Sequence, residues 1–232
     1  TPGTPWASTQ APLPQLSALQ IRKACASFPP HTAVGIDDLR PRHLALLPDI
    51  ALELLARLYS FSEALGTPLH MGANIVFLPK PAGGERPIGI LPTLYRVWGR
   101  CRRPLADQWE QAHQRRYFWA SKGRSSERAV HYQGVRMEHA RATGAAAAGL
   151  LTDLAKAYEY VNRDKLRRFA HVHGFPAAAT ELSLATYAST RRIVVQGQCS
   201  HWFAVGGQTI IAGCSLATTL LKVYTLTMFD AL

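Results

Sequence analysis

The sequence predicts an α+β fold on the basis of three patterns. Residues 73–92 hold two apolar, β-prone runs on either side of a Pro/Gly-rich turn, which is typical of a β-hairpin. Residues 94–109 place apolar side chains at i, i+4 spacing, as an amphipathic helix does. Residues 191–196 and 202–205 alternate like two further strands around Gly197. A chain of 232 residues can bury a substantial core, in one or two compact units.

The charge balance favours a polyanionic partner. Lys plus Arg number 26 and Asp plus Glu 15, a net charge of +11, which suits nucleic acid or an anionic membrane surface. No uncharged apolar run approaches the ~20 residues of a membrane-spanning helix, and no basic-then-apolar signal peptide opens the chain. Four widely spaced cysteines without a Cys-x-x-Cys pair argue against disulfides or zinc. They favour a reduced intracellular location, in the nucleus or the cytoplasm.

The first part of the chain is predicted to be a lead-in followed by helices. Residues 1–14 carry four prolines and no charge, so residues 1–28 are expected to form a flexible lead-in and a short helix that Pro29-Pro30 stops. The absence of an initial Met predicts an excerpt of a longer chain. Residues 32–39 place Gly35 two residues before Asp37, a turn that can cap the next helix. A helical pattern then runs through Leu44, Leu47, Ile50, Leu54 and Leu58.

Two cations lie at the mouth of the predicted hairpin. Lys80 and Arg86 flank its turn, and such a pair can hold a triphosphate, with Lys as a point charge and Arg as a bidentate fork. The alternative is two solvated charges at a turn.

A basic run with interleaved aromatic residues follows the hairpin. This pattern suits a surface that tracks a nucleic-acid backbone and stacks bases, although the aromatic residues are equally consistent with core positions. The basic residues are Arg96, Arg100, Arg102, Arg103, Arg115, Arg116, Lys122, Arg124 and Arg128, and the aromatic residues are Tyr117, Phe118 and Trp119.

Asp153 stands where a short apolar run, long enough for a buried strand, gives way to a helix-like pattern. A carboxylate at the end of a core strand needs a compensating charge, most simply a metal ion or a basic partner. The alternative is that Asp153 caps the following helix. Further helices are predicted over residues 164–173, with Arg163 and Arg167 outward, over 182–187, and from Leu216 to Met228.

In their order along the chain, these stretches resemble the motifs of reverse transcriptases of the non-LTR retrotransposon and group II intron type. Asp153, Ala157-Tyr158, an acid and Val161 match the first metal-binding motif. Lys80-Pro81, a Gly-rich gap and Arg86-Pro87-Ile88 match the fingers hairpin, and Gly35-x-Asp37 is similar to a weaker upstream element. Residues 211–217 resemble the next motif, with two departures: Ala212 stands in place of a Gln, and Ala217-Thr218 in place of Ser-Pro.

The resemblance implies a reverse-transcriptase fingers–palm fold, incomplete at its C-terminus, with fingers over residues 29–149 and a partial palm over 150–232. It implies that Asp153 and the Leu154 carbonyl hold Mg2+ or Mn2+, that Lys80 and Arg86 bind the triphosphate, and that Ala157, Tyr158 and Gly213 contact the nucleotide or its template base. The partners would be an RNA template, a DNA primer and deoxynucleoside triphosphates. The oligomeric state stays open.

A second carboxylate motif, an aromatic-x-Asp-Asp turn, is absent before Leu232. The piece is therefore expected to be inactive by itself. Two alternatives remain: a non-catalytic nucleic-acid-binding remnant of such a polymerase, and an unrelated basic RNA-binding module.

Overall fold

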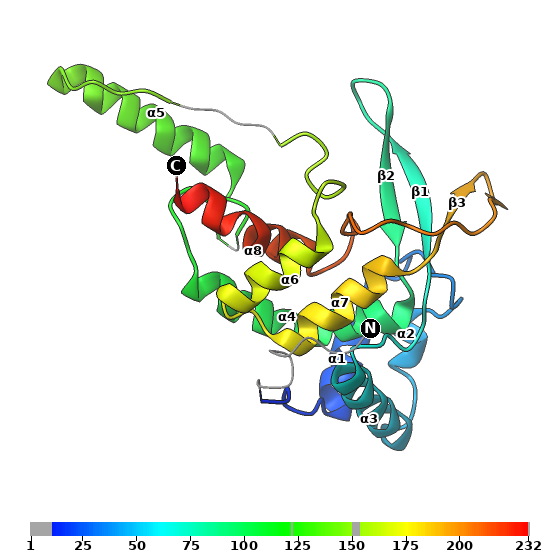
Figure 1. The fold of residues 1–232 in the computed structure, drawn as a ribbon. Coiled ribbons are helices and arrows are strands. Elements are labelled where there is room, and N and C mark those ends of the chain that lie inside the picture. The colour runs from blue at the N-terminus through cyan, green and yellow to red at the C-terminus, as the bar shows by residue number, and fades with distance from the viewer. Residues whose placement is uncertain (1–10, 122, 150–153, 232) are drawn as a thin grey trace.

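The fold is mixed α and β, as the sequence predicts. A computed structural model describes residues 11–121, 123–149 and 154–231, and Figure 1 traces their order. The strands in these ranges are β1 (Ala73–Pro79), β2 (Glu85–Ile90), β3 (Arg191–Val195) and β4 (Gln198–Cys199). The helices are α1 (Ala18–Ala26), α2 (Pro41–Leu44), α3 (Asp49–Leu65), α4 (Thr93–Ala112), α5 (Ser126–Thr143), α6 (Arg163–Val172), α7 (Ala177–Ala188) and α8 (Ala217–Asp230).

The four described strands form one sheet with the order β2-β1-β3-β4. The predicted hairpin is confirmed: β1 pairs with β2 in antiparallel register, and Leu78 lies opposite Arg86. β3 joins β1 in parallel, with Ala73 opposite Arg191, and β4 pairs with β3 in antiparallel fashion. The sheet therefore contains strands from both sides of residue 150, so the two predicted units share it. The division between them stays a prediction.

The core lies among the helices below the hairpin (Figure 1). Trp98 of α4, Tyr59 of α3, Tyr187 of α7 and Leu220 of α8 are fully buried there. Side chains of the sheet are mostly half-buried, because the hairpin extends away from the helices. α5 also projects from the body, and none of its residues is buried. The helical body thus carries two protruding elements.

The predicted helices are largely confirmed where local signals are strong. Ser17 forms a capping box with Gln20 at the start of α1, which satisfies two backbone donors that helix geometry leaves unpaired. Asn162 caps α6 by accepting from the Lys165 N–H. α4 and α8 cover the ranges that their apolar spacing predicts.

The apolar pattern from Leu44 to Leu58 predicts one helix, and this prediction is wrong in two respects. The pattern divides into α2 and α3, with Pro48 at the N-cap of α3. Its side chains from Leu47 onward face solvent, whereas Leu52 and Tyr59 face the core. Asp37 does not cap the next helix either. Its carboxylate accepts from the Leu94 N–H at 3.2 Å and so satisfies a donor at the start of α4.

Two other local predictions are wrong. The segment after Asp153 forms consecutive turns over residues 155–160 in place of a helix, with Lys156 at φ 48°. Arg163, expected to point outward, is buried because the loop before α8 folds over it.

Candidate nucleotide and nucleic-acid site

The hairpin presents its two cations to solvent. The turn is closed by the Lys80 N–H, which donates to the Gly84 carbonyl at 3.0 Å, and by the Gly83 N–H, which donates to the Lys80 carbonyl at 3.1 Å. Gly83 and Gly84 have φ angles of 87° and 79°, a region that favours glycine. The side chains of Lys80 and Arg86 are exposed, and neither bonds to another described residue. Their charges are available to an external anion.

The base of the hairpin is fixed to the loop before α8. The Gly89 N–H donates to the Ala212 carbonyl at 3.1 Å. A Cβ added at Gly89 would lie 2.2 Å from Ile211 Cγ2, and one at Gly213 would lie 3.0 Å from the Gly89 carbonyl. Gly213 also has a φ of 102°. The glycine at position 213 is therefore required by close contact with this chain's own hairpin, and its role beside a nucleotide stays a prediction.

The same loop contacts the segment that follows Asp153. The Ile210 N–H donates to the Tyr158 carbonyl at 2.9 Å, and the Thr209 N–H donates to the Val161 carbonyl at 2.9 Å. Tyr158 packs partly against the core, and its hydroxyl lies 3.4 Å from Thr218 Oγ1. Residues 209–218 thus contact both the hairpin and the Asp153 motif, which are far apart in the sequence.

The remaining predicted residues of that motif differ in exposure. Leu154 is 42% exposed, and Ala157 is half-buried in the turn segment. Asp153 lies outside the described residues, as does Lys122. Within the described ranges, no group of three His, Cys, Asp or Glu side chains is arranged to hold a metal ion. A carboxylate and a backbone carbonyl are hard oxygen donors that fit Mg2+ or Mn2+.

Most of the arginines predicted to form a nucleic-acid surface contact the protein itself. Arg102 is buried, and its guanidinium forms a bidentate ion pair with Glu63, with distances of 2.6 and 2.7 Å. Arg115 bonds to Asp230 through two nitrogens, at 2.8 and 3.0 Å. Arg103 pairs with acids on its own helix, and the others donate to backbone carbonyls: Arg96 to Ala33, Arg100 to Ser27, Arg124 to Arg115 and Phe118, and Arg128 to Gly123.

The predicted basic surface is therefore smaller than the sequence indicates. A guanidinium has five donors, so a nearby carbonyl or carboxylate recruits it readily. Arg116 is exposed and bonds to no other described residue. The aromatic residues divide between the two predicted roles: Phe118 packs against the core, whereas Tyr117 is 39% exposed and donates to Asp230.

The buried Arg163 is a site residue that the sequence did not reveal. Its guanidinium donates to the carbonyls of Gly206, Gln208 and Thr209, and its backbone N–H donates to Gly207. These bonds hold the loop that leads to Gly213. Burial lowers the pKa of Arg163. The backbone carbonyls accept from its guanidinium and so offset the cost of burying the charge without a carboxylate partner. No local signal marks such a residue, since its acceptors lie more than 40 positions away.

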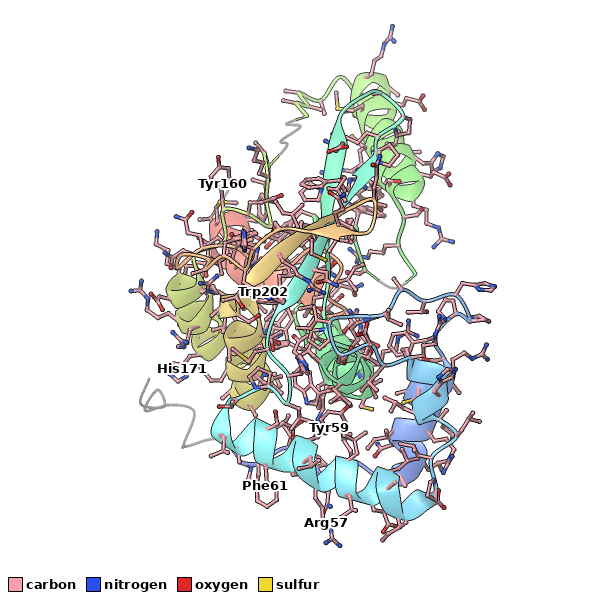
Figure 2. All side chains as sticks on the ribbon, turned by 90° about the vertical axis from the view of Figure 1, so that its right-hand side faces the viewer. Arg57, Tyr59, Phe61, Tyr160, His171 and Trp202 are labelled. Atoms are coloured by element: carbon pink, nitrogen blue, oxygen red, sulfur yellow. The ribbon has the colours of Figure 1, made fainter. Side chains whose placement is uncertain are left out.

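A second missed feature lies on the sheet. Trp202 is 47% exposed, and the Arg192 guanidinium lies 5.0 Å from its ring centroid. The Arg192 Nε also donates to Asn74 Oδ1 at 2.8 Å. Figure 2 shows Trp202 beside the strands. An exposed indole beside a fixed cation has the chemistry of a stacking platform for a base.

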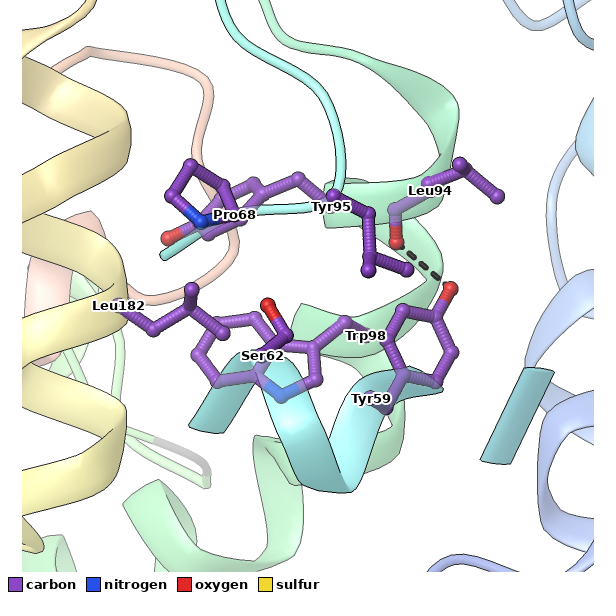
Figure 3. A pocket seen from close by; sticks show the side chains of 8 residues that line it. Tyr59, Ser62, Pro68, Leu94, Tyr95, Trp98 and Leu182 are labelled. Atoms are coloured by element: carbon purple, nitrogen blue, oxygen red, sulfur yellow. Dashed lines mark hydrogen bonds between the residues drawn. The ribbon is translucent and has the colours of Figure 1, made fainter. Parts of the chain in front are cut away.

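A small pocket lies between α3, α4 and α7. Tyr59, Trp98 and Leu182 line it, and the Tyr59 hydroxyl donates to the Leu94 carbonyl at 2.8 Å across one wall (Figure 3). Its lining is aromatic and aliphatic and contains none of the predicted site residues. The pocket is therefore a feature of core packing.

No helix among the described residues is long and apolar enough to cross a membrane. No protein-family model and no curated protein sequence matches this chain, so the reverse-transcriptase resemblance depends on its own motifs and their arrangement.

Proposed function

We propose that this chain is the fingers and first palm segment of an RNA-directed DNA polymerase of the reverse-transcriptase type. The observation that carries the proposal is the contact between motif segments that are remote in sequence. The hydrogen bond from Gly89 to Ala212 joins the hairpin to the loop before α8, and the bond from Ile210 to Tyr158 joins that loop to the Asp153 motif. Three matching motifs in one order, held together in space, support a shared site.

The chain's own residues would bind and orient the nucleotide. Lys80 and Arg86, exposed and without partners in the described part of the chain, would neutralise the triphosphate through charge-assisted hydrogen bonds. The Tyr158 ring, braced at its hydroxyl by Thr218, would lie under the sugar. Asp153 and the Leu154 carbonyl would hold divalent cations, which supply charge stabilisation for in-line displacement at the α-phosphorus by a primer 3′-hydroxyl.

The nucleotide site is tested by substituting the hairpin cations. We expect Lys80→Ala and Arg86→Ala each to weaken binding of a deoxynucleoside triphosphate by roughly tenfold to a hundredfold, because each removes one charge-assisted contact worth on the order of 1.5–3 kcal/mol. Lys165→Ala and Arg168→Ala are matched controls. Both residues are exposed on α6, and each substitution removes one positive charge, as the hairpin substitutions do. Equal weakening by the control pair, measured by equilibrium dialysis, would refute specific recognition by the hairpin.

The catalytic role of Asp153 is tested in a chain extended to include an aromatic-x-Asp-Asp turn. Asp153→Asn should abolish primer extension and leave binding to a primer–template nearly intact, because the amide keeps the shape but loses the charge that two cations need. The predicted helix after Asp153 is a series of turns, so the alternative is a local bond from Asp153 to the turn backbone; Asn makes such a bond equally well, and extension would then continue. Asp164→Asn is the control, because Asp164 is a neighbouring acid whose side chain is 78% exposed.

The second candidate function is a non-catalytic nucleic-acid-binding remnant. Ala212 favours it. The resemblance places a nucleotide-contacting Gln at this position, whereas here only the backbone carbonyl of Ala212 makes a contact, by accepting from the Gly89 N–H of the hairpin. Both candidates require binding to an RNA–DNA hybrid that weakens with salt, with a log–log slope of about −0.7 to −0.9 per neutralised phosphate. Only the polymerase requires hairpin-dependent binding of nucleotide, so the two measurements separate them.

A further inference from the structure

α3 carries an apolar stripe on its outer face. Its inner face is buried through residues such as Leu52 and Tyr59. In Figure 2, Phe61 and Arg57 point away from the body while Tyr59 points into it. The outer stripe consists of Leu47 (36% exposed), which precedes α3, and of the α3 residues Ile50 (64%), Leu54 (53%), Leu58 (49%), Phe61 (66%) and Leu65 (75%).

The stripe is large for a surface that stays in water. If a fully exposed side chain of this size presents about 200 Å², the six present on the order of 600–700 Å² together. A monomer's largest contiguous apolar patch is typically about 300–600 Å² and is often functional. The described part of the chain leaves this stripe uncovered. A face of this size indicates an interaction surface.

The spacing of the stripe suits a straight partner helix. Within α3, Ile50 and Phe61 are separated by eleven residues, and so are Leu54 and Leu65. An eleven-residue repeat corresponds to about 3.67 residues per turn, so its side chains stay nearly in line along an α-helix. A second helix can therefore lie along the full length of α3.

The charges beside the stripe identify the partner as a second copy of this chain. Glu53 and Arg57 lie on the same flank of α3, both exposed, and neither forms an ion pair with a described residue. Two α3 helices packed antiparallel about a two-fold axis near residue 55 bring Glu53 of each copy level with Arg57 of the other. Such an isologous interface forms the pair twice. A parallel arrangement would separate these flanks.

We infer that this chain forms a homodimer through antiparallel packing of α3 against α3 of a second copy. Both stripes together would bury at most about 1,300 Å², near the lower end of the range for specific interfaces. An interface of this area leaves little favourable free energy after the entropic cost of association is subtracted. The expected dissociation constant is therefore on the order of micromolar. The inference does not depend on the proposed function.

The test is the oligomeric state of the chain by sedimentation velocity from about 1 to about 200 μM, a range that brackets this affinity. We expect a reversible monomer–dimer equilibrium. Leu58→Glu should weaken it at least about tenfold, because it places a charge in the apolar seam. Val172→Glu, which alters an apolar residue of α6 that is more exposed (69%) than Leu58 (49%), should leave it unchanged. Thermal melts verify that both variants fold.

A charge exchange tests the antiparallel register. Glu53→Arg and Arg57→Glu should each weaken the dimer by placing like charges opposite one another, and the double exchange should restore it. A chain that stays monomeric throughout the concentration range overturns the inference. That result is expected if another part of the chain covers the stripe. Equal dissociation by Val172→Glu, or a double exchange that fails to restore association, also overturns it.

Discussion

The buried ion pair between Glu63 and Arg102 joins α3 to α4 at the centre of the protein. The two side chains are 6% and 5% exposed. Arg102 forms two bonds to the carboxylate and a third, of 2.8 Å, to the Pro14 carbonyl. Glu63 also accepts from the Trp98 indole N–H at 2.7 Å. Each guanidinium nitrogen of Arg102 and each carboxylate oxygen of Glu63 therefore has a hydrogen-bond partner, which is the condition under which a buried pair is tolerated.

Glu63→Gln leaves the Arg102 guanidinium buried without a counter-charge. Loss of one partner from such a pair costs about 3–5 kcal/mol of unfolding free energy. For a domain of this size, that corresponds to a fall in Tm of roughly 6–20 °C. Replacing both residues, Glu63→Leu with Arg102→Met, should cost less than either single change, because no charge remains to be desolvated.

The assay is thermal and urea unfolding of the single and double variants. Asp107→Asn is the control: its carboxylate pairs with Arg103 on the same helix, but both side chains are exposed (43% and 35%). An exposed pair is worth about 0–1 kcal/mol. If Glu63→Gln costs no more than Asp107→Asn, or if the double variant loses as much as both singles combined, the account of Arg102 as a structural residue is wrong.

Two further predictions concern the sugar pocket and the cysteines. In a chain extended to the second acidic motif, Tyr158→Phe should stay selective for deoxyribonucleotides. Tyr158→Ala should admit ribonucleotides at least about tenfold more readily, since a missing ring leaves room for the 2′-hydroxyl. An unchanged ratio of ribonucleotide to deoxyribonucleotide incorporation in single-nucleotide extension, with matched thermal melts, would end this hypothesis. Burial raises the pKa of Cys25 to about 11 and of Cys101 to about 12. Because the thiolate is the reactive form, iodoacetamide at pH 8 should modify exposed Cys199 first and these two cysteines only after unfolding. Equal modification rates for the three thiols in the folded protein would contradict their burial.

The local elements of the fold were largely predictable. The capping residues of α1, the apolar spacing of α4 and the Pro/Gly turn of the hairpin all act within a few residues. Backbone geometry and side-chain periodicity set such elements before any distant contact forms. The motif order that supports the proposed function is also a property of the sequence alone.

The contacts between those elements required the tertiary structure. Nothing local predicts that β3 pairs in parallel with β1, 118 residues earlier, where Arg192 donates to Asn74. Nor does the sequence reveal that Gly213 is set against Gly89, or that Arg163 holds the loop between them. Register and close approach depend on what each segment meets, and that partner is remote in the chain.

The sequence by itself determined most of the helices and the hairpin, and which residues carry charge; the tertiary structure decided which way each face points. α3 illustrates the difference, because its apolar stripe is the side that faces solvent and its second apolar face packs inside. Arg102 illustrates it again, because a residue that belongs to a basic run is buried against Glu63. Periodicity specifies a helix, but burial is decided by the neighbours that pack against it, and a charge is free to bind a ligand only if no nearer acceptor has already taken it.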